Sequence, residues 1–367
     1  MIASFADSVV QFRGALIGEL LRRHATVTVI APPCQESTRV GIERLGVRLI
    51  AVPMIRNGIS PLADLVTFYR LTKVLRQLRP THVLSYTIKP VVFGSLAARL
   101  AGVSSVSALI TGLGYVFVGF GLRARVVGYA ARALLRLALG CCHSVIFQND
   151  DDREFLRELG MIGRRVRIAT VNGSGVPLRD FSLAPMPKDV SFLMIARFVR
   201  EKGVLEYMKA AEVVRGRHPE VSVRLLGWAE SGLAGLSQSE VANLARFSGV
   251  DVLARTEDVR PAIRECAVFV LPSYREGTPR TVLEAMAMGR PVITTDVPGC
   301  RQTVQADVTG WLVPPRNADA LAAAMCTAIE ARDRLEAMGL AGRRRAEMRF
   351  DADSVARATA DAMGVTC

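Results

Sequence analysis

Two glutamates, Glu276 and Glu284, stand eight positions apart in REGTPRTVLEAMAMGRP (275–291), directly after the apolar run AVFVLP (267–272). The run has the length and composition of a buried strand, and the stretch after it has the small, apolar residues of a packed helix. Glu284 is surrounded by Val, Leu, Ala and Met, where a carboxylate is costly unless a partner hydrogen-bonds to it. The pattern therefore indicates a ligand whose hydroxyl groups reach the inner carboxylate.

The turn between this strand and this helix favours an anion. We expect Thr278 to cap the helix, Pro279 to occupy its first position and Gly289 to end it. Gly277 would then lie in the turn, where the missing side chain lets a ligand approach the backbone. The N–H groups and the positive end of the helix dipole would bind a phosphate there, between the two carboxylates.

Two cations follow an earlier strand. SFLMIARF (191–198) is a predicted strand, and Arg197 and Lys202 stand five positions apart in RFVREKG (197–203), before another helix. Because the carboxyl ends of parallel strands meet at one edge of a sheet, both cations should face the same site as Glu276. Two cations in that position suit a diphosphate.

The same side chains also allow a purely structural interpretation. Glu284 could pair with Arg280, four residues earlier on one helix face. Glu276 could be a simple loop acid, and Arg197 and Lys202 could be solvated loop charges. The residues alone leave both interpretations open.

Strands and helices alternate along almost the whole chain, which is typical of parallel sheets covered by helices. In the first half we predict strands at 26–32, 47–53, 82–86, 105–111 and 144–149, and helices near 14–23, 61–78, 92–101, 123–139 and 150–159. In the second half we predict strands at 191–198, 221–227, 250–254, 267–272, 291–296 and 310–314. The fold class is therefore α/β, with two doubly wound, Rossmann-like domains facing each other across a cleft.

The length of 367 residues is large for one core, so two domains are expected. We place the first domain at 1–180 and the second at 181–350, with FSLAPMPKDV (181–190) as the linker. Residues 351–367 would form a C-terminal helix that could cross back to the first domain. Only Met1 to Ser4 are available as a strand before the first helix, so that strand is very short or the natural chain begins earlier.

The net charge of +13 lies almost entirely in the first half. Residues 1–180 hold 23 Lys and Arg against 11 Asp and Glu, a balance of +12, whereas residues 181–367 hold 24 against 23. The first half should therefore face an anionic partner, either nucleic acid or an acidic membrane surface. Aromatic residues make up only 6% and form no stacking platform, which disfavours nucleic acid.

The sequence carries no sign of a membrane span or of secretion. No apolar stretch is long enough to predict a transmembrane helix, and the first residues lack the pattern of a signal peptide. The seven cysteines are odd in number and include no C-x-x-C pair, so they fit buried thiols in a reducing cytoplasm.

Three stretches carry a resemblance to a known family: ARFVREKG, SYREGTPRTVLEAMAMGRPVITTDVPG and TGWLVPP. They resemble the family 4 retaining glycosyltransferases of the GT-B fold. The likeness continues in FRGALIGELLRRHATVTVIAP and NGSGVPLRDFS, and so covers nearly the whole chain. YTIKPVVFGSLAARLAGV and ITGLGYVF are similar to a bacterial subgroup that extends lipid-linked oligosaccharides for O-antigen, capsule or glycoprotein glycans.

The resemblance implies a role for each matching residue. Arg197 and Lys202 would bind the donor's diphosphate and stabilise the leaving nucleotide, and Glu276 would contact the transferred sugar, which makes these three the catalytic set. Glu284 would accept hydrogen bonds from the ribose hydroxyls. The other residues expected to touch the donor are Gly277, Thr278 and Arg280 at the helix start, and Gly249, Val250 and Leu253 in a loop around the base. No metal or other cofactor is implied, because a nucleotide leaving group mainly requires charge stabilisation and positioning.

The resemblance further implies a UDP-sugar donor, with an N-acetylhexosamine or a related sugar, and a polyprenyl-diphosphate-linked acceptor. The enzyme would act as a peripheral protein on the cytoplasmic face of the inner membrane. Lys89 in SYTIKP (85–90), where many relatives carry a histidine nearby, would bind acceptor phosphate or donor sugar, or would be an ordinary surface lysine.

The segment from Tyr115 to Leu139 is the most membrane-like part of the sequence. Its arginines recur at roughly helical spacing, at Arg123, Arg125, Arg132 and Arg136. Such a helix could lie in an anionic interface, or it could be a core helix with arginines on its wet side.

Two other functions remain open at this point. A UDP-sugar 2-epimerase also uses paired nucleotide-binding domains, but it needs no basic, membrane-like first half. A non-catalytic sugar-nucleotide binder would not need the complete set of two cations and two glutamates. The acids of NDDDREFLREL, Asp150 to Asp152, resemble a metal-binding D-x-D motif, but their position favours a helix start.

Overall fold

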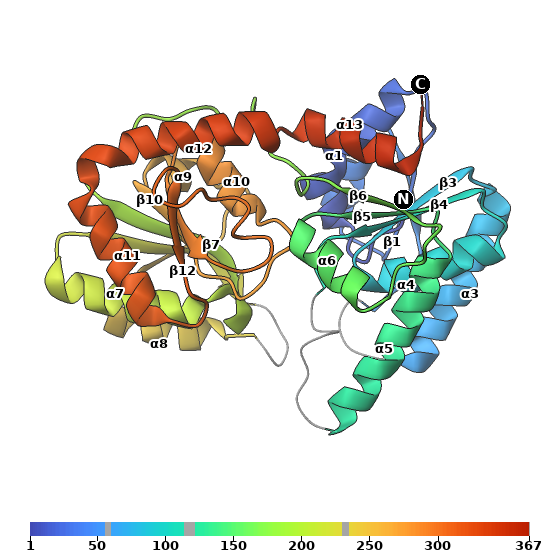
Figure 1. The fold of residues 1–367 in the computed structure, drawn as a ribbon, viewed down its shortest axis with the longest axis horizontal. Coiled ribbons are helices and arrows are strands. Elements are labelled where there is room, and N and C mark those ends of the chain that lie inside the picture. Colours follow the sequence, from blue (N-terminus) through green and yellow to red (C-terminus); the bar gives the residue numbers. More distant parts are fainter. Residues whose placement is uncertain (56–59, 114–121, 230–234, 367) are drawn as a thin grey trace. The chain divides into compact units, whose positions relative to one another are not determined.

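The computed structural model describes residues 1–55, 60–113, 122–229 and 235–366, with only the backbone of 122–127 (Figure 1). The chain forms two compact units. Unit 1 comprises Met1–Gly175 and Ala352–Cys367, and unit 2 comprises Val176–Asp351. The expected linker at 181–190 thus lies inside unit 2, because Phe181 and Ala184 pack into its core.

Unit 2 is built on a parallel sheet that has six strands within the described residues, in the order β12-β11-β10-β7-β8-β9. The strands are β7 (Ser191–Phe198), β8 (Ser222–Ala229), β9 (Asp251–Leu253), β10 (Val268–Leu271), β11 (Val292–Thr295) and β12 (Gly310–Val313). They match the predicted second-half strands. The match is close because strands covered on both faces are near-continuous apolar runs, and all residues of β10 and β11 are buried.

Helices separate these strands. They are α7 (Val204–Arg217), α8 (Gln238–Ser248), α9 (Arg260–Arg264), α10 (Arg280–Ala287), α11 (Ala318–Glu330) and α12 (Leu335–Arg349), with the short 3-10 helices η2 (Arg200–Lys202) and η3 (Arg332–Arg334). Phe192, Phe198 and Phe269 are fully buried between the sheet and the helices. The alternation is that of a doubly wound domain.

Unit 1 also has parallel strands: β1 (Thr28–Ala31), β2 (Arg48–Ala51), β3 (His82–Tyr86), β4 (Ser105–Ile110), β5 (Ser144–Phe147) and β6 (Arg167–Thr170). Ile2 bridges Ile30 on one side and Ser85 on the other, so it joins the β1-β2 pair to the β3-β4-β5-β6 sheet. Isolated bridges of Ile2 thus occupy the place where the first strand was expected. The first-half strands were predicted except for β6, whose exposed, arginine-containing sequence carries little strand signal.

The helices of unit 1 are α1 (Asp7–Arg22), α2 (Glu36–Arg44), α3 (Pro61–Leu78), α4 (Ile88–Leu100), α5 (Leu122–Gly140) and α6 (Asp150–Glu158). Two helix starts were predicted too late. The α1 helix begins at Asp7 rather than 14, because the chain turns directly after the bridges of Ile2. The α4 helix begins at Ile88 rather than 92, because Pro90 falls in its first turn, where proline is tolerated. The α2 helix was not predicted.

The helix start at NDDD is confirmed. Asn149 caps α6, and its side-chain oxygen accepts a hydrogen bond from the backbone N–H of Asp152. Among the described helices, none combines the length and apolar character that a membrane crossing requires.

The C-terminal helix α13 (Ala352–Met363) belongs to unit 1 and packs against α1 (Figure 1). Arg23 at the end of α1 donates to the carboxylate of Asp361 and to the carbonyl of Val365, each at 2.6 Å. The chain thus passes into unit 2 once and returns to complete the packing of its first unit.

Candidate active site

The sheet of unit 2 changes its direction of winding between β7 and β10. Strands β8 and β9 extend the sheet on one side of β7, and β10, β11 and β12 extend it on the other. Phe192 pairs with Val268 and Leu193 with Phe269 in parallel register, so the carboxyl ends of β7 and β10 lie at the same edge. Loops that leave adjacent strands in opposite directions open a crevice there, which is where doubly wound domains bind their ligands.

The sequence-predicted charges follow these two strand ends. Arg197 is the penultimate residue of β7 and is partly buried, and Lys202 lies in η2, directly after it. Glu276 lies in the loop after β10. The expectation that the two strands bring these charges to one edge is therefore fulfilled by the strand order.

A glycine locks the two loops against each other. Gly203 has a φ of 74°, and a Cβ atom at this position would lie 2.1 Å from the carbonyl oxygen of Pro272. In addition, the backbone N–H of Tyr274 donates to the carbonyl of Glu201 at 2.8 Å. A side chain at 203 would separate the loop that carries Lys202 from the loop that carries Glu276.

Lys202 and Glu276 form an ion pair between these loops. Their side chains are 21% and 12% exposed, so neither is a solvated loop charge. The hydroxyl of Ser273 donates to the same carboxylate oxygen, Oε1, at 2.7 Å. Ser273 is fully buried, and its carbonyl accepts a hydrogen bond from the hydroxyl of Thr295 on β11. The carboxylate of Glu276 is thus held by a cation from one strand end and a hydroxyl from the other.

Ser273 is a positioning residue that the sequence does not reveal, because a serine after a strand has no specific signal. We expect Ser273→Ala to lower kcat about tenfold, since a hydrogen bond to a charged group contributes roughly 1.5–3 kcal/mol. KM for the donor should change little, because Lys202 and Arg197, which would contact the diphosphate, are unchanged. Steady-state kinetics would measure both values, with Ser248→Ala, a buried serine of α8, as the control. Equal activity of both variants would refute the role of Ser273.

Glu284 is buried in α10, and the Nε of Arg280 donates to its Oε1 at 2.9 Å. Burial raises the pKa of the Glu284 carboxyl, and the nearby Arg280 guanidinium opposes this shift. The pairing that the structural interpretation required is therefore present. It does not exclude a ligand, because a carboxylate offers about four acceptor positions and this bond uses one.

The raised pKa of Glu284 makes a prediction about stability. A carboxyl whose pKa is higher in the folded state than in the unfolded state binds more protons when folded, so it costs stability as pH rises through that interval. Glu284→Gln removes this cost. We therefore expect the stability of the variant relative to the parent protein to increase from pH 4.5 towards pH 7.5, as measured by urea unfolding. A difference that is constant or decreases over that range would contradict the burial effect.

The start of α10 differs by one residue from the prediction. The extended residue Pro279 is the N-cap, the helix starts at Arg280, and the hydroxyl of Thr278 instead contacts the carbonyl of Gly277 and accepts from the amide of Gln302 at 2.7 Å. Proline cannot cap with a side chain, so the helix begins without a side-chain cap. The helix ends at Ala287, with Gly289 in the left-handed conformation just beyond, as predicted.

A second glycine fixes the backbone at Gly277. Gly299 has a φ of 81°, and a Cβ at this position would lie 2.3 Å from the carbonyl oxygen of Glu276 and 2.6 Å from that of Gly277. The N–H of Glu276 donates to the carbonyl of Pro298 at 3.1 Å. The turn between the two glutamates is therefore supported from the loop after β11.

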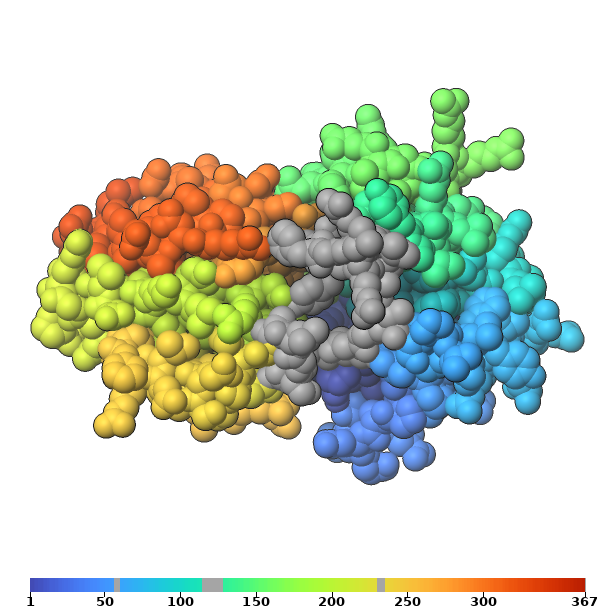
Figure 2. All heavy atoms as spheres, turned by 90° about the horizontal axis from the view of Figure 1, so that it is seen from below, coloured from blue at the N-terminus to red at the C-terminus, as the bar shows by residue number. Residues whose placement is uncertain are grey.

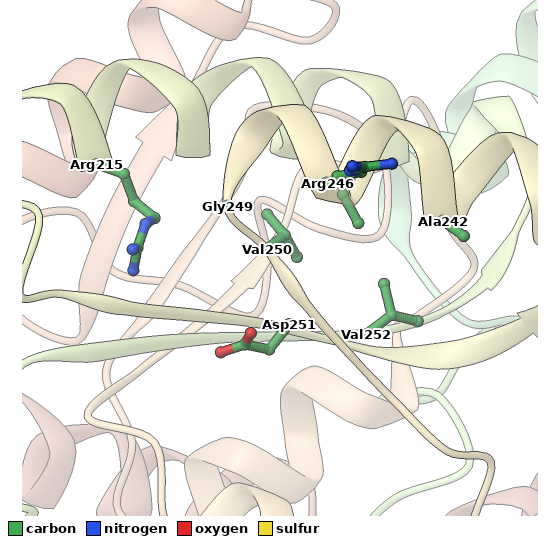
Figure 3. Close-up of a pocket in the computed structure, with 8 residues that line it drawn as sticks. Arg215, Ala242, Arg246, Gly249, Val250, Asp251 and Val252 are labelled. Atoms are coloured by element: carbon green, nitrogen blue, oxygen red, sulfur yellow. The ribbon is translucent and has the colours of Figure 1, made fainter.

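Two of the residues expected around the base lie at the amino edge of the sheet. Gly249 is the left-handed cap of α8, and Val250 leads into the amino end of β9. Because all six strands are parallel, this end is opposite the carboxyl ends that carry Lys202 and Glu276. Gly249 and Val250 instead line a shallow hollow of about 490 Å³ with Arg215, Arg246 and Asp251 (Figure 3). Leu253, the last residue of β9, does lie at the carboxyl edge.

An exposed aromatic residue lies beside Arg197 at this edge. Trp228, near the end of β8, is opposite Arg197 in the parallel register and is 37% exposed. The guanidinium of Arg255, two residues after β9, lies 5.0 Å from the centre of its ring. Neither residue was predicted. A tryptophan at the end of a mostly apolar strand reads as a core residue, so the sequence gives no signal for it.

Lys89 belongs to unit 1, where it lies in the first turn of α4. Its Nζ is 2.8 Å from Oδ1 of Asp64 in the first turn of α3, and the two side chains are 17% and 11% exposed. Lys89 is therefore not an ordinary surface lysine. Thr87, which precedes α4, has a φ of 66°, an uncommon conformation for a non-glycine residue.

The arginine-containing helix is α5, and part of the predicted segment lies outside the described residues. This applies to Tyr115 to Gly121 and to the side chains of Arg123 and Arg125. Arg132 lies over the ring of Tyr129 at 5.2 Å, and Arg136 is exposed. Leu135, Ala138 and Leu139 are buried, whereas Tyr129, Leu134 and Leu137 are exposed, so the described part of α5 packs one face into unit 1 and presents apolar side chains and Arg136 on another.

Both units of the chain match models of known protein families. Residues 189–331 match the family model described as glycosyl transferases group 1, and residues 9–172 match the glycosyl transferase 4-like domain. The two matches together span most of both units. The chain is a glycosyltransferase of this family. It is therefore an enzyme, and its two α/β units with parallel sheets are those of the GT-B fold.

Several bacterial glycosyltransferases are similar to it along most of their length. The N,N'-diacetylbacillosaminyl-diphospho-undecaprenol alpha-1,3-N-acetylgalactosaminyltransferase of Campylobacter jejuni is 29% identical over 325 residues, 85% of this chain and 84% of that protein. A UDP-Gal:alpha-D-GlcNAc-diphosphoundecaprenol alpha-1,3-galactosyltransferase of Escherichia coli is 24% identical, over 74% of this chain and 72% of that protein.

Solved structures show the same fold at lower identity. HepE of Anabaena in complex with UDP and glucose has a TM-score of 0.78 and 17% identity, and the match covers 99% of this glycosyltransferase and 98% of HepE. Sucrose-phosphate synthase of Thermosynechococcus elongatus has a TM-score of 0.77 and 19% identity, over 94% and 90% of the two chains.

Proposed function

We propose that this glycosyltransferase moves an N-acetylhexosamine or a related sugar from a UDP-sugar to a saccharide linked to polyprenyl diphosphate, with retention of anomeric configuration. It would act as a peripheral protein on the cytoplasmic face of the inner membrane, in the assembly of a cell-surface polysaccharide or glycan. The observation that carries the donor half of this proposal is the ion pair of Lys202 and Glu276 at the switch point of unit 2. Arg197 lies near the end of β7 at the same edge, and Glu284 lies in α10, the helix that follows the Glu276 loop.

The relatives support the acceptor class. The names of the Campylobacter jejuni and Escherichia coli proteins both state a saccharide on undecaprenol diphosphate as the acceptor, and the first states N-acetylgalactosamine as the sugar. The structure of HepE was determined with UDP and glucose. A UDP-sugar and a lipid diphosphate are thus the substrates most consistent with this chain's similarities.

The residues of unit 2 suggest how the donor is handled. The diphosphate would replace Glu276 as the partner of Lys202, and Arg197 would contact the same phosphates. Glu276 would then be free to turn towards the transferred sugar, while Ser273 keeps its carboxylate oriented. Glu284 would accept from the ribose hydroxyls beside Arg280. As the bond to the sugar breaks, the two cations would stabilise the charge that develops on UDP.

Incubation with UDP-sugars and a polyprenyl-diphosphate-linked sugar tests the proposal. We expect an extended lipid-linked saccharide, and free UDP only when both substrates are present. Consumption of the UDP-sugar to an epimer without acceptor would favour the 2-epimerase alternative. Binding of UDP-sugar with no turnover on any lipid-linked acceptor would favour a non-catalytic binder.

A further inference from the structure

One face of α3 in unit 1 is exposed, and its chemistry changes along the helix. The first two turns present apolar side chains with exposed fractions of 80%, 62%, 48% and 68%, namely Leu62, Leu65, Val66 and Tyr69. The next turns of the same face present exposed cations, namely Arg70, Lys73 and Arg76. These seven residues are called the α3 face below. Such a cluster of large exposed apolar side chains marks a surface that is covered in use.

The opposite side of α3 is firmly packed. Leu71 and Leu75 are buried in the core of unit 1. Asp64, the single acid in the sequence of α3, is buried and forms the ion pair with Lys89 on α4. The α3 face therefore belongs to a fixed helix and contributes no acid of its own.

The apolar end of the face lies at the carboxyl edge of the strands of unit 1. Helices α3, α4 and α5 lie side by side, and each follows a strand, so their first turns are at the carboxyl edge of the sheet (Figure 1). The Lys89–Asp64 pair joins the first turns of α4 and α3. In the view from below, α3 (blue to light blue) lies at the surface (Figure 2). The apolar turns of α3 are therefore next to the edge where Lys89 stands.

We propose that the α3 face docks this glycosyltransferase on an anionic lipid bilayer. The apolar turns would insert at the boundary of the acyl chains, and the basic turns would contact the headgroups. A second copy of the chain is the competing occupant. In a two-fold symmetric dimer whose axis passes through the α3 face, each α3 face would meet the other, and neither would bring an acid to the three cations. The charge pattern therefore favours lipid. The inference rests on the proposed function, because a polyprenyl-linked acceptor is presented at such a surface.

Flotation of the full chain with vesicles tests this docking. We expect binding to vesicles of phosphatidylglycerol and phosphatidylethanolamine, weaker binding to phosphatidylcholine alone, and a decrease with rising salt. Replacing Leu62, Leu65 and Tyr69 together by serine should lower the partition coefficient about tenfold or more. Lys73→Gln with Arg76→Gln should weaken binding to the anionic vesicles only. Phe247→Ser is the matched control, since Phe247 is 82% exposed on α8 of unit 2.

Unchanged vesicle binding by the triple serine variant would overturn the proposal. Size-exclusion chromatography tests the competing occupant. If the parent protein is a dimer and the triple variant is a monomer that still binds vesicles like the parent, the α3 face holds a second copy and the proposal is overturned. The substitutions are at exposed positions, and thermal unfolding of each variant checks that the fold is kept.

Two acceptors that differ in their lipid chain distinguish a failure of the docking proposal from a failure of the proposed function. The triple variant should retain transfer to a water-soluble, short-chain diphosphate-linked sugar and lose transfer to the same sugar on a long polyprenol in vesicles. If the parent protein binds vesicles but transfers to neither acceptor, the proposed function fails and the docking stands. If it transfers to both while the triple variant binds vesicles like the parent, the docking fails and the function stands.

Discussion

Lys202→Met is expected to lower kcat about 100- to 1,000-fold, the usual effect of removing one preorganised group that stabilises developing charge. Two causes act together. The leaving diphosphate loses a cation, and Glu276, which is 12% exposed, loses the partner that neutralises it in the donor-free enzyme. UDP release in the presence of saturating donor and acceptor measures the effect. Lys209→Met is the control, because Lys209 is an exposed lysine on α7, the next helix.

Comparing the two lysine variants shows whether Lys202 only holds two loops together or also binds the diphosphate. If it only fastens two loops, Lys202→Met should lower the midpoint of thermal unfolding and leave kcat nearly intact. If it binds the diphosphate, kcat should decrease strongly and the affinity for UDP should decrease with it. An effect on kcat no larger than that of Lys209→Met would rule out a catalytic role for Lys202.

Gly203→Ala is expected to destabilise unit 2 by roughly 2–4 kcal/mol, from the left-handed backbone and from displacement of packed backbone. The φ of 74° disfavours any side chain, and the new Cβ would lie 2.1 Å from the carbonyl oxygen of Pro272. The variant should also lose activity, because the loop of Lys202 must move away from the loop of Ser273 and Glu276. Urea unfolding and transfer assays on the same preparations measure both effects.

Gly216→Ala provides the matched control for this substitution. Gly216 lies near the end of α7, and a Cβ there meets nothing within 4 Å. Alanine is favoured over glycine in a helix by roughly 0.5–1 kcal/mol, so this variant should be as stable as the parent or more stable. Equal stability of the two alanine variants would show that the close approach at Gly203 is not needed.

The sequence predicted those parts of the site that depend on local pattern and on the parallel-strand rule. The apolar runs of β7 and β10 clearly predicted two strands. Arg197, Lys202 and Glu276 lie at or after the carboxyl ends of these strands and so at one edge of the sheet. The ion pair between Lys202 and Glu276 could not be predicted, because it depends on the contact of two loops at Gly203 and Pro272. The position of Gly249 at the amino edge could not be predicted either, because a glycine between a helix and a strand resembles a ligand-binding loop at either edge of a sheet.

The exposed apolar residues of the α3 face could not be predicted from the sequence either. Periodic arginines drew attention to α5, whereas the apolar residues of α3 are distributed around the whole helix in sequence and resemble a core helix. Only the packing shows which of them are covered: Leu71 and Leu75 are buried, and Leu62 and Tyr69 are not. Exposure of an apolar side chain is a tertiary property that periodicity alone does not reveal.

A crystal structure of unit 2's site with UDP bound to the full chain tests the central claim most directly. We predict the phosphates within hydrogen-bonding distance of Lys202 and Arg197 at the carboxyl ends of β7 and β10, the ribose hydroxyls on the carboxylate of Glu284, and Glu276 no longer paired with Lys202. UDP bound at the opposite edge of the sheet, or bound with the Lys202–Glu276 pair intact and Glu284 out of reach, would contradict it.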